Sequence, residues 1–475
     1  MAFLSLLTLL VCSQATFEKT FGSYDNDEGA AIAVCSDGTY ILAGSVENIY
    51  TGDADVFLAR INPDGDTLWT RKFYNEYKDD YATDVIQSAD QGFIITGYTT
   101  SDNISTPFLL KYDESGHFVW LKKYGTEIPD GYAIAMVEKP DSGYMISGRR
   151  DYYNADWYHR PFMLETNQEG DCIWYDIYTF GDYAKYQVNH MFLTDENEYV
   201  LCGYYEQSDI SLIGHAWLFK VDSGMNVVWT KTYGPSDSTA SSYYVEPAGD
   251  GGYIICGTIY PGSIPWPGGD YDIFLVKTDS SGTAVWTRSI GNSDDSEYGR
   301  CIKKTEDGGY IIGGQSNFGT GNLDIWMLKT DEMADTLWTR RYGGSNSEGI
   351  REICLTPDGG YLLCGTTDSY GMGGTDIYLV KTDENGLMTR IKENEDVLSA
   401  VKVFPNPGNG LFLIRNCPEN MNYKIFDFCG RLVVSKEQVT GPVEKVDISN
   451  QSPGIYFLRV TSSLSSRSFE IIRNR

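Results

Sequence analysis

The 475-residue chain has little histidine and lacks the short motifs that mark common enzyme classes. Its four histidines, His117, His159, His190 and His215, are scattered without an HExxH or other paired spacing, so no zinc centre is expected. A nucleophile elbow, a phosphate-binding loop and a dinucleotide-binding fingerprint are also absent. We therefore expect neither a metal nor an organic cofactor.

Positive charge is scarce. The chain has 37 Lys and Arg against 66 Asp and Glu, a formal net charge of -29. Residues 401–475 hold 10 basic and 6 acidic residues (+4), which leaves 27 against 60 (-33) in residues 1–400. A body this acidic repels phosphate backbones, which argues against a nucleic-acid partner. The change of sign near residue 400 indicates a domain boundary.

Long apolar runs are also missing. The longest, Phe3 to Val11, is too short to span a bilayer and is followed by Ser13-Gln14-Ala15, a small-x-small pattern. We interpret residues 1–15 as a secretory signal peptide cleaved after Ala15. A lipoprotein anchor on Cys12 is the alternative, but the bulky Val11 departs from that pattern. We expect a protein that is not an integral membrane protein.

Three sequence patterns recur seven times with a period of 51 to 57 residues. The first is an aromatic residue four positions before a glycine, at Tyr40, Phe93, Tyr144, Tyr199, Tyr253, Tyr310 and Tyr361. The second is an apolar strand of the type DIFLVKTD, ending at Asn62, Asp113, Asn167, Asp222, Asp279, Asp331 and Asp383. The third is a strand carrying Trp seven residues later, at Trp69, Trp120, Trp174, Trp229, Trp286 and Trp338.

The seventh copy of the third pattern is not found after Asp383. It lies at the other end of the chain, where Phe17 takes the Trp position in FEKTFG. Four short strands per repeat, separated by turn residues, are typical of a β-propeller. We therefore predict an all-β protein with a seven-bladed β-propeller over residues 16–391, in which residues 17–22 provide the outer strand of the last blade. The repeats resemble those of secreted bacterial seven-bladed propellers, a resemblance that implies a fold rather than an activity.

The ten cysteines do not indicate a disulfide framework. Cys202, Cys256 and Cys364 share one repeat position, which small residues such as Ala43 and Ser147 fill in other repeats. We expect buried, incidental thiols there. The acidic loop 291–297 shows no EF-hand order of ligands, so we interpret its carboxylates as solvated turn residues rather than a calcium site.

The loops offer a candidate ligand face. In each repeat the first two and last two strands are joined by tight turns, whereas the other connections vary in length and share one face of the ring. Exposed aromatic residues gather in two long loops of that face: Tyr152, Tyr153, Trp157, Tyr158 and Trp266. Flat rings with polar edges suit sugars or a protein partner. The alternative is that these rings fold back over the blade edges.

After a charged linker at 392–400, the tail 401–475 changes character. Three motifs follow in order, VKVFPNPGNGLFLI, YKIFDFCGRLVV and VDISNQSPGIYFLRV, which predict a small immunoglobulin-like β-sandwich. The residues that carry the pattern are Pro405, Asn406, Pro407, Gly410, Gly430, Gly454 and Tyr456. The tail closely resembles the type A C-terminal sorting domain of the type IX secretion system of Bacteroidota-like bacteria. The resemblance implies export by that machinery, followed by release or attachment to the outer cell surface.

Together these features predict an exported or cell-surface propeller that acts as a binding or scaffold module for an extracellular glycan or protein rather than as an enzyme. An extracellular carbohydrate-active hydrolase or lyase that uses loop carboxylates is the alternative, because a propeller can bring distant Asp and Glu residues together on one face.

Overall fold

The computed structural model describes residues 15–48, 51–75, 78–152, 158–181, 184–207, 213–260, 270–292, 295–318, 322–388, 401–417, 421–427, 431–439, 441–461 and 466–474. The chain divides into two compact units, residues 1–389 and 390–475, and each is described by itself. The predicted signal peptide before Ala15 and the linker 392–400 lie outside the described residues. No helix among the described residues could cross a membrane.

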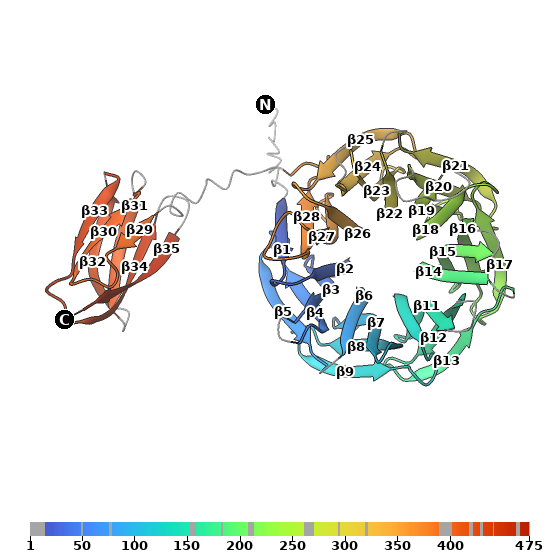
Figure 1. Cartoon of the computed structure of the whole chain (residues 1–475), viewed down its shortest axis with the longest axis horizontal. Coiled ribbons are helices and arrows are strands. Elements are labelled where there is room, and N and C mark those ends of the chain that lie inside the picture. Colours follow the sequence, from blue (N-terminus) through green and yellow to red (C-terminus); the bar gives the residue numbers. More distant parts are fainter. Residues whose placement is uncertain are drawn as a thin grey trace, which may run out of the picture. The chain divides into compact units, whose positions relative to one another are not determined.

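The first unit consists of seven four-stranded antiparallel sheets arranged around an axis, as Figure 1 shows. Strands are named a to d from the axis outwards. Blades one to three are β2 (Asp27–Val34), β3 (Tyr40–Glu47), β4 (Ala54–Ile61) and β5 (Thr67–Phe73); β6 (Asp79–Gln87), β7 (Phe93–Ser101), β8 (Ile104–Tyr112) and β9 (Phe118–Lys123); and β10 (Gly131–Glu138), β11 (Tyr144–Tyr152), β12 (Tyr158–Thr166) and β13 (Cys172–Ile177).

Blades four to seven complete the ring. Their strands are β14 (Ala184–Leu193), β15 (Tyr199–Gln207), β16 (Gly214–Val221) and β17 (Val227–Tyr233); β18 (Thr239–Pro247), β19 (Tyr253–Tyr260), β20 (Asp272–Thr278) and β21 (Ala284–Ile290); β22 (Glu297–Lys304), β23 (Tyr310–Ser316), β24 (Asp324–Thr330) and β25 (Thr336–Tyr342); and β26 (Glu348–Leu355), β27 (Tyr361–Thr367) and β28 (Asp376–Thr382) with β1 (Phe17–Phe21). The predicted all-β, seven-bladed fold is confirmed.

Strand β1 is the outer strand of blade seven. It pairs antiparallel with β28, with Phe17 opposite Lys381 and Phe21 opposite Ile377. The Lys381 ammonium group, which is fully buried, also donates a hydrogen bond to the carbonyl oxygen of Ala15 at 2.6 Å. The two ends of the propeller sequence therefore meet within one sheet.

The recurring Trp residues explain how neighbouring blades are joined. Four of the six Trp rings lie against the turn glycine between strands c and d of the next blade, so that a Cβ added to Gly116 would lie 2.9 Å from Trp69. Gly170 has the same relation to Trp120, and Gly65 has it to Phe17. These turn glycines have positive φ, which a residue with a Cβ adopts less readily. Phe17 thus replaces the Trp in contact as well as in sequence.

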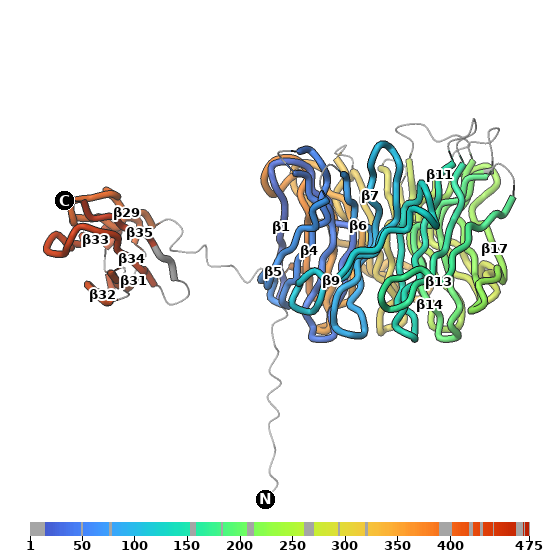
Figure 2. Tube along the Cα trace, turned by 90° about the horizontal axis from the view of Figure 1, so that it is seen from below, coloured from blue at the N-terminus to red at the C-terminus, as the bar shows by residue number. Residues whose placement is uncertain are grey.

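Every inner strand contains a β-bulge at the same place. In β6 the register shifts between Ala82 and Asp84, and in β26 it shifts between Ile350 and Glu352. A bulge sets two residues of one strand against one of its partner, which reverses the inside-outside alternation beyond it. Residues before and after the bulge therefore reach different surroundings although they share a strand. Seen from the side in Figure 2, these strands run between two faces of the ring.

The second unit is a two-sheet β-sandwich. Its strands are β29 (Lys402–Phe404), β30 (Leu411–Arg415), β31 (Met421–Asp427), β32 (Leu432–Val439), β33 (Val443–Asp447), β34 (Gly454–Thr461) and β35 (Ser466–Arg473). They form one sheet in the order β29-β30-β33 and another in the order β32-β31-β34-β35. Phe412, Ile425 and Leu458 are among the buried residues between the sheets. This agrees with the predicted small β-sandwich.

Four residues of the predicted tail pattern stabilise the ends of these strands. The Asn406 side chain accepts a hydrogen bond from the Ile472 amide at 2.8 Å, and the Tyr456 hydroxyl donates one to the Ser452 carbonyl at 2.6 Å. Gly410 has a φ of 101° where β30 begins, and Gly454 opens β34. Gly430 lies outside the described residues.

Candidate binding cavity on the propeller axis

A cavity of about 360 Å³ lies on the propeller axis, lined by residues from all seven blades. Inner strands supply most of the lining: in β6 the residues are Tyr81 to Asp84, and in β26 they are Ile350 to Glu352. These residues precede or follow the bulge directly. The cavity therefore occupies the half of the axis nearer to the b–c and d–a connections, the face with the variable loops.

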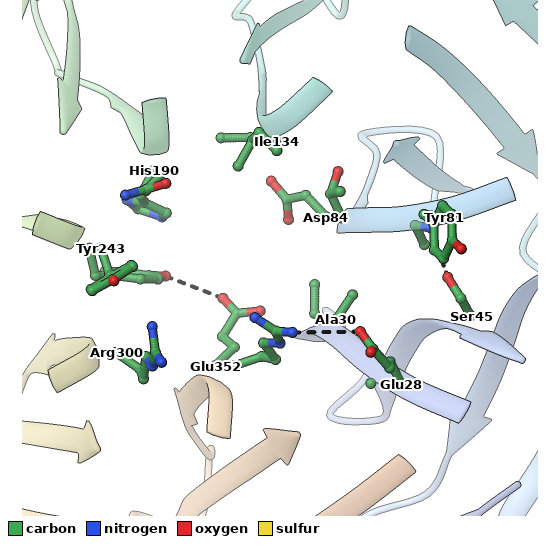
Figure 3. A pocket seen from close by; sticks show the side chains of 18 of the residues that line it. Glu28, Ala30, Ser45, Tyr81, Asp84, Ile134, His190, Tyr243, Arg300 and Glu352 are labelled. Atoms are coloured by element: carbon green, nitrogen blue, oxygen red, sulfur yellow. Dashed lines mark hydrogen bonds and ion pairs between the residues drawn. The ribbon is translucent and has the colours of Figure 1, made fainter. Parts of the chain in front are cut away.

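The residue directly after each bulge points towards the axis. Around the ring these residues are Ala31, Asp84, Ala135, His190, Tyr244, Cys301 and Glu352. Four of the seven carry acidic, basic or phenolic groups, although most inward positions of the repeats are small or apolar. Figure 3 shows Asp84, His190 and Glu352 directed into one space from three different blades. The closed ring therefore brings together polar and ionisable side chains that are far apart in the sequence.

Glu352 is held by two other blades. Its Oε2 accepts a hydrogen bond from the Ile32 amide at 2.9 Å, and its Oε1 accepts one from the Tyr244 hydroxyl at 3.2 Å. Lys303 donates to the Tyr244 oxygen at 2.6 Å and to Glu246 at 2.7 Å. Burial opposes the charge of Lys303, but the attraction of Tyr244 and the two glutamates outweighs it and raises the pKa of the ammonium group. Lys303 therefore stays charged beneath the cavity.

Asp84 also accepts hydrogen bonds from backbone amides, but it forms no ion pair with any described residue. Its two oxygens accept hydrogen bonds from the Val85 amide at 2.8 Å and from the Met136 amide of the next blade at 2.9 Å. Burial, followed by the negative charge of Glu352, raises the pKa of Asp84 to about 8. At neutral pH this carboxyl group is largely protonated and can donate a hydrogen bond into the cavity.

His190 completes the inner wall between these two acids. Its ring stacks on that of Tyr244 with centroids 3.6 Å apart. Burial and the nearby charge of Lys303 lower its pKa well below the usual value, so the imidazole is neutral. Its Nδ1 atom is buried and has no hydrogen-bond partner among the described residues. The ring therefore lies in the cavity wall with one buried nitrogen that has no partner among the described residues.

Aromatic rings and arginines surround the inner residues. The Tyr81 and Tyr98 rings lie 5.2 Å apart. On another side, the Arg300 guanidinium lies 4.6 Å from the Tyr243 ring and donates to the Gln315 side chain at 3.1 Å. The Arg351 guanidinium forms an ion pair with Glu28 at 3.5 Å. Tyrosine faces and polar groups thus share the same wall (Figure 3).

Two of the aromatic residues predicted as a ligand face, Tyr152 and Tyr158, lie within the described residues and do not line this cavity. Tyr152 and Tyr158 stack on each other, with ring centroids 4.9 Å apart and planes at 12°, at the ends of β11 and β12. The Arg160 guanidinium lies over both rings, at 5.4 and 5.1 Å. Tyr153, Trp157 and Trp266 lie outside the described residues. The loop face stays a proposal, separate from the cavity.

Sequence reasoning missed the inner residues. They belong to strands whose alternating pattern indicates only a packed core, and no motif joins them. One signal was available: when the repeats are aligned on the aromatic-x-x-x-Gly pattern, the position after the bulge alternates between alanine, cysteine and strongly polar residues. Such a change of chemistry at one fixed position marks a place that packing alone does not explain.

The family model of the secretion-system C-terminal sorting domain matches residues 402–473. Residues 402–473 are a C-terminal sorting domain. The chain is therefore an exported protein, secreted or attached to the outer cell surface, and its tail is the part addressed to the type IX secretion machinery. No curated protein matches the chain.

Three solved structures that are similar to the chain have 9 to 15% sequence identity to it. PorZ of Porphyromonas gingivalis, described as an essential surface component of the type IX secretion system, has 15% identity and a TM-score of 0.42. That match covers 93% of this chain, which spans 58% of the length of PorZ. A Dyadobacter fermentans protein of unknown function matches at 9% identity and TM-score 0.43, covering 77% and 98% of the two chains. The propeller domain of a Pyrococcus furiosus protease matches at 10% identity and a TM-score of 0.44. That match covers 78% of this chain and 100% of the protease domain.

Proposed function

We propose that this exported propeller is a binding module that holds a polyhydroxylated, sugar-like ligand in its axial cavity. The observation that supports the proposal is the convergence of hydrogen-bonding side chains from separate blades on one space of about 360 Å³. That volume lies within the range of about 300 to 1,000 Å³ common for small-ligand sites.

The chemistry of the wall suits hydroxyl groups. A protonated Asp84 donates a hydrogen bond, and the side chain of Glu28 in the same wall can accept one. A sugar hydroxyl can do both, whereas a phosphate or carboxylate would meet Glu352 and Glu28 at the same wall. The Tyr81 ring adds a flat apolar surface of the kind on which sugar rings stack.

Binding to a glycan array tests the proposal. The full chain is compared with the cavity variants His190→Ala and Tyr81→Ala and with the loop variants Tyr158→Ala and Trp266→Ala. We expect the cavity variants to lose at least tenfold in affinity for the glycans that the full chain retains, and the loop variants to stay within threefold. The reverse pattern would assign binding to the loops, and the absence of any retained glycan would contradict the proposal.

A carbohydrate-active hydrolase or lyase is the second candidate. The observation that favours it is that Asp84 and Glu352 face the same cavity and that burial raises the pKa of both carboxyl groups, as a general acid requires. These carboxyl groups come from inner strands rather than from loops. Turnover of a polysaccharide panel that is lost in both Asp84→Asn and Glu352→Gln would establish this activity. Binding of a glycan without turnover would favour the binding module over the enzyme.

A further inference from the structure

Four of the seven blade junctions contain a pair of carboxyl groups, and seven of these eight residues are buried while Asp272 is half-buried. One member opens strand c of a blade, and the other lies at or next to the start of strand a of the following blade. The pairs are Asp55 with Asp80, Asp272 with Glu297, Asp324 with Glu348, and Asp376 with Asp27. None of these residues lines the axial cavity.

The two carboxyl groups of a pair approach the same point. At the junction of blades six and seven, a Cβ added to Gly343 would lie 2.1 Å from Asp324 Oδ1 and 2.3 Å from Glu348 Oε2. The two oxygens therefore lie within 4.4 Å of each other, the sum of these distances. Gly22 and Gly291 have the same relation to the pairs beside them. Two negative charges this close repel each other strongly where water is excluded.

Oxygen atoms in these pairs are left without donors. Asp324 is 1% exposed, and its Oδ1 has no hydrogen-bond partner among the described residues. At the junction of blades one and two, Asp55 Oδ1 and Asp80 Oδ2 are buried and without a partner in the same part of the chain. A buried carboxylate oxygen without a donor is unfavourable unless something positive binds it.

The other three junctions lack both members of the pair. The equivalent positions hold Thr106 and Gly131, Arg160 and Tyr186, and His215 and Ala240. No junction keeps one carboxyl group and loses the other. An acidic residue that served only to cap its own strand would not need its partner in the next blade, so the two carboxyl groups function as a unit.

A shared proton or a cation could relieve the repulsion. Only Asp324 has an ion pair, with Arg341, among the described residues of these pairs. One shared proton neutralises one of two paired carboxylates, whereas one divalent cation balances the charge of both.

We propose that the four paired junctions bind divalent cations of the calcium type, which link each blade to the next. Carboxylate oxygens are the preferred ligands of such hard cations. Within the described residues no group of three or more acidic, His or Cys side chains is arranged for a metal. The remaining ligands would be water, which is typical of weak extracellular sites with Kd of about 0.1 to 1 mM.

Calcium titration of the full chain tests this proposal. After treatment with a chelator, the chain is titrated with CaCl₂ by calorimetry, and its thermal unfolding is followed at pH 7.5 with and without 10 mM CaCl₂. We expect up to four bound ions and a rise in Tm of about 5 °C or more. The variant Asp324→Asn/Glu348→Gln should bind one ion fewer and show a smaller rise. Without calcium it should unfold at a higher temperature than the unmodified chain, because the repulsion is removed.

A matched control separates this effect from general charge. The variant Glu306→Gln/Glu332→Gln removes two exposed acidic residues of blade six and should leave both the number of ions and the rise in Tm unchanged. The proposal is overturned if calcium changes neither heat nor Tm while a decrease from pH 8 to pH 5 raises Tm, which would indicate shared protons. It is also overturned if the paired variant binds as much calcium as the unmodified chain.

Discussion

Two acidic residues four positions apart on one strand meet opposite surroundings. On β26, Glu348 is buried at a blade junction while Glu352 faces the axial cavity, and on β6 the same holds for Asp80 and Asp84. A regular strand would direct both members of such a pair to the same side. The bulge between them reverses the alternation, so one strand serves the junction before the bulge and the axis after it. Burial alone therefore does not tell a structural carboxyl group from a functional one.

The two regions also neutralise their acids differently. At the axis, Glu352 and Asp84 each accept a hydrogen bond from a backbone amide of the next blade. The Tyr244 hydroxyl donates to Glu352 and in turn accepts a hydrogen bond from Lys303. At the junctions, the carboxyl groups meet in pairs. The axis should consequently tolerate local changes, whereas the junctions should determine the stability of the whole ring.

Removal of β1 should have the largest effect. A chain that begins at Tyr24 loses the Phe17 contact with Gly65, five residue pairs with β28 and the Ser23 amide that donates to Asp27. We expect a loss of about 4 kcal/mol or more in unfolding free energy, measured by denaturant unfolding. Removal of residues 401–475, a separate compact unit, should leave the propeller transition unchanged while it prevents export. Equal stability of the β1 deletion and the full chain would show that the ring does not need this strand.

A glycine substitution compares paired and unpaired junctions directly. In Gly22→Ala the new Cβ would lie 1.6 Å from Asp376 Oδ1 and 2.7 Å from Asp27 Oδ2, so both carboxyl groups must move. In Gly125→Ala, the equivalent position between blades two and three, the nearest atoms are those of Thr106 at 3.1 Å. We expect losses of about 2 to 3 kcal/mol for the first and below about 1 kcal/mol for the second, by urea unfolding. Similar values would argue against a special constraint at the paired junction.

The pH dependence of stability should identify the junction acids. Burial raises the folded-state pKa of Glu297 to about 7, above its usual value of 4.5, so the folded state binds the proton more tightly than the unfolded state. In buffer that contains a chelator and no divalent ions, the free energy of unfolding should therefore fall as pH rises from about 4.5 to 7. Glu297→Gln should reduce this fall by about 2 kcal/mol. The exposed Glu306→Gln serves as the control, and an equal change in both variants would contradict the assignment.

At the axis we expect a small effect on stability and a clear one on binding. Because the pKa of Asp84 is about 8, ligand affinity should decrease as pH rises through 8 if the protonated carboxyl donates to the ligand. Asp84→Asn keeps a donor at this position, so its affinity at pH 7 should stay within about threefold and lose its dependence on pH. Glycan binding measured between pH 6 and 9 provides the comparison. A decrease near pH 8 that persists in the variant would exclude Asp84 as its cause.

The repeats predicted the seven blades because each blade is a local unit with turns of nearly constant length. In most blades its Trp ring also packs on the turn glycine of the next blade. Phe17 could be assigned for the same reason. The cavity could not, because Asp84, His190 and Glu352 come together only when the ring closes, and because a bulge leaves no reliable trace in an apolar and polar alternation. Of the predicted loop aromatics, Tyr152 and Tyr158 illustrate a further limit: the sequence placed them in a loop, whereas they end β11 and begin β12 and stack on each other.

The meeting of the chain ends in blade seven has a consequence for the order of folding. The Tyr378 hydroxyl and the Glu18 carboxylate to which it donates are 360 positions apart in the chain. Contacts of such sequence separation form late and slow the overall reaction, because the entropy of a long loop is lost before the contact compensates for it. During synthesis the β1 segment emerges first and its partner β28 emerges last among the propeller strands. The first segment of the ring is therefore the last to find its place, and only a chain with all seven blades can complete the fold.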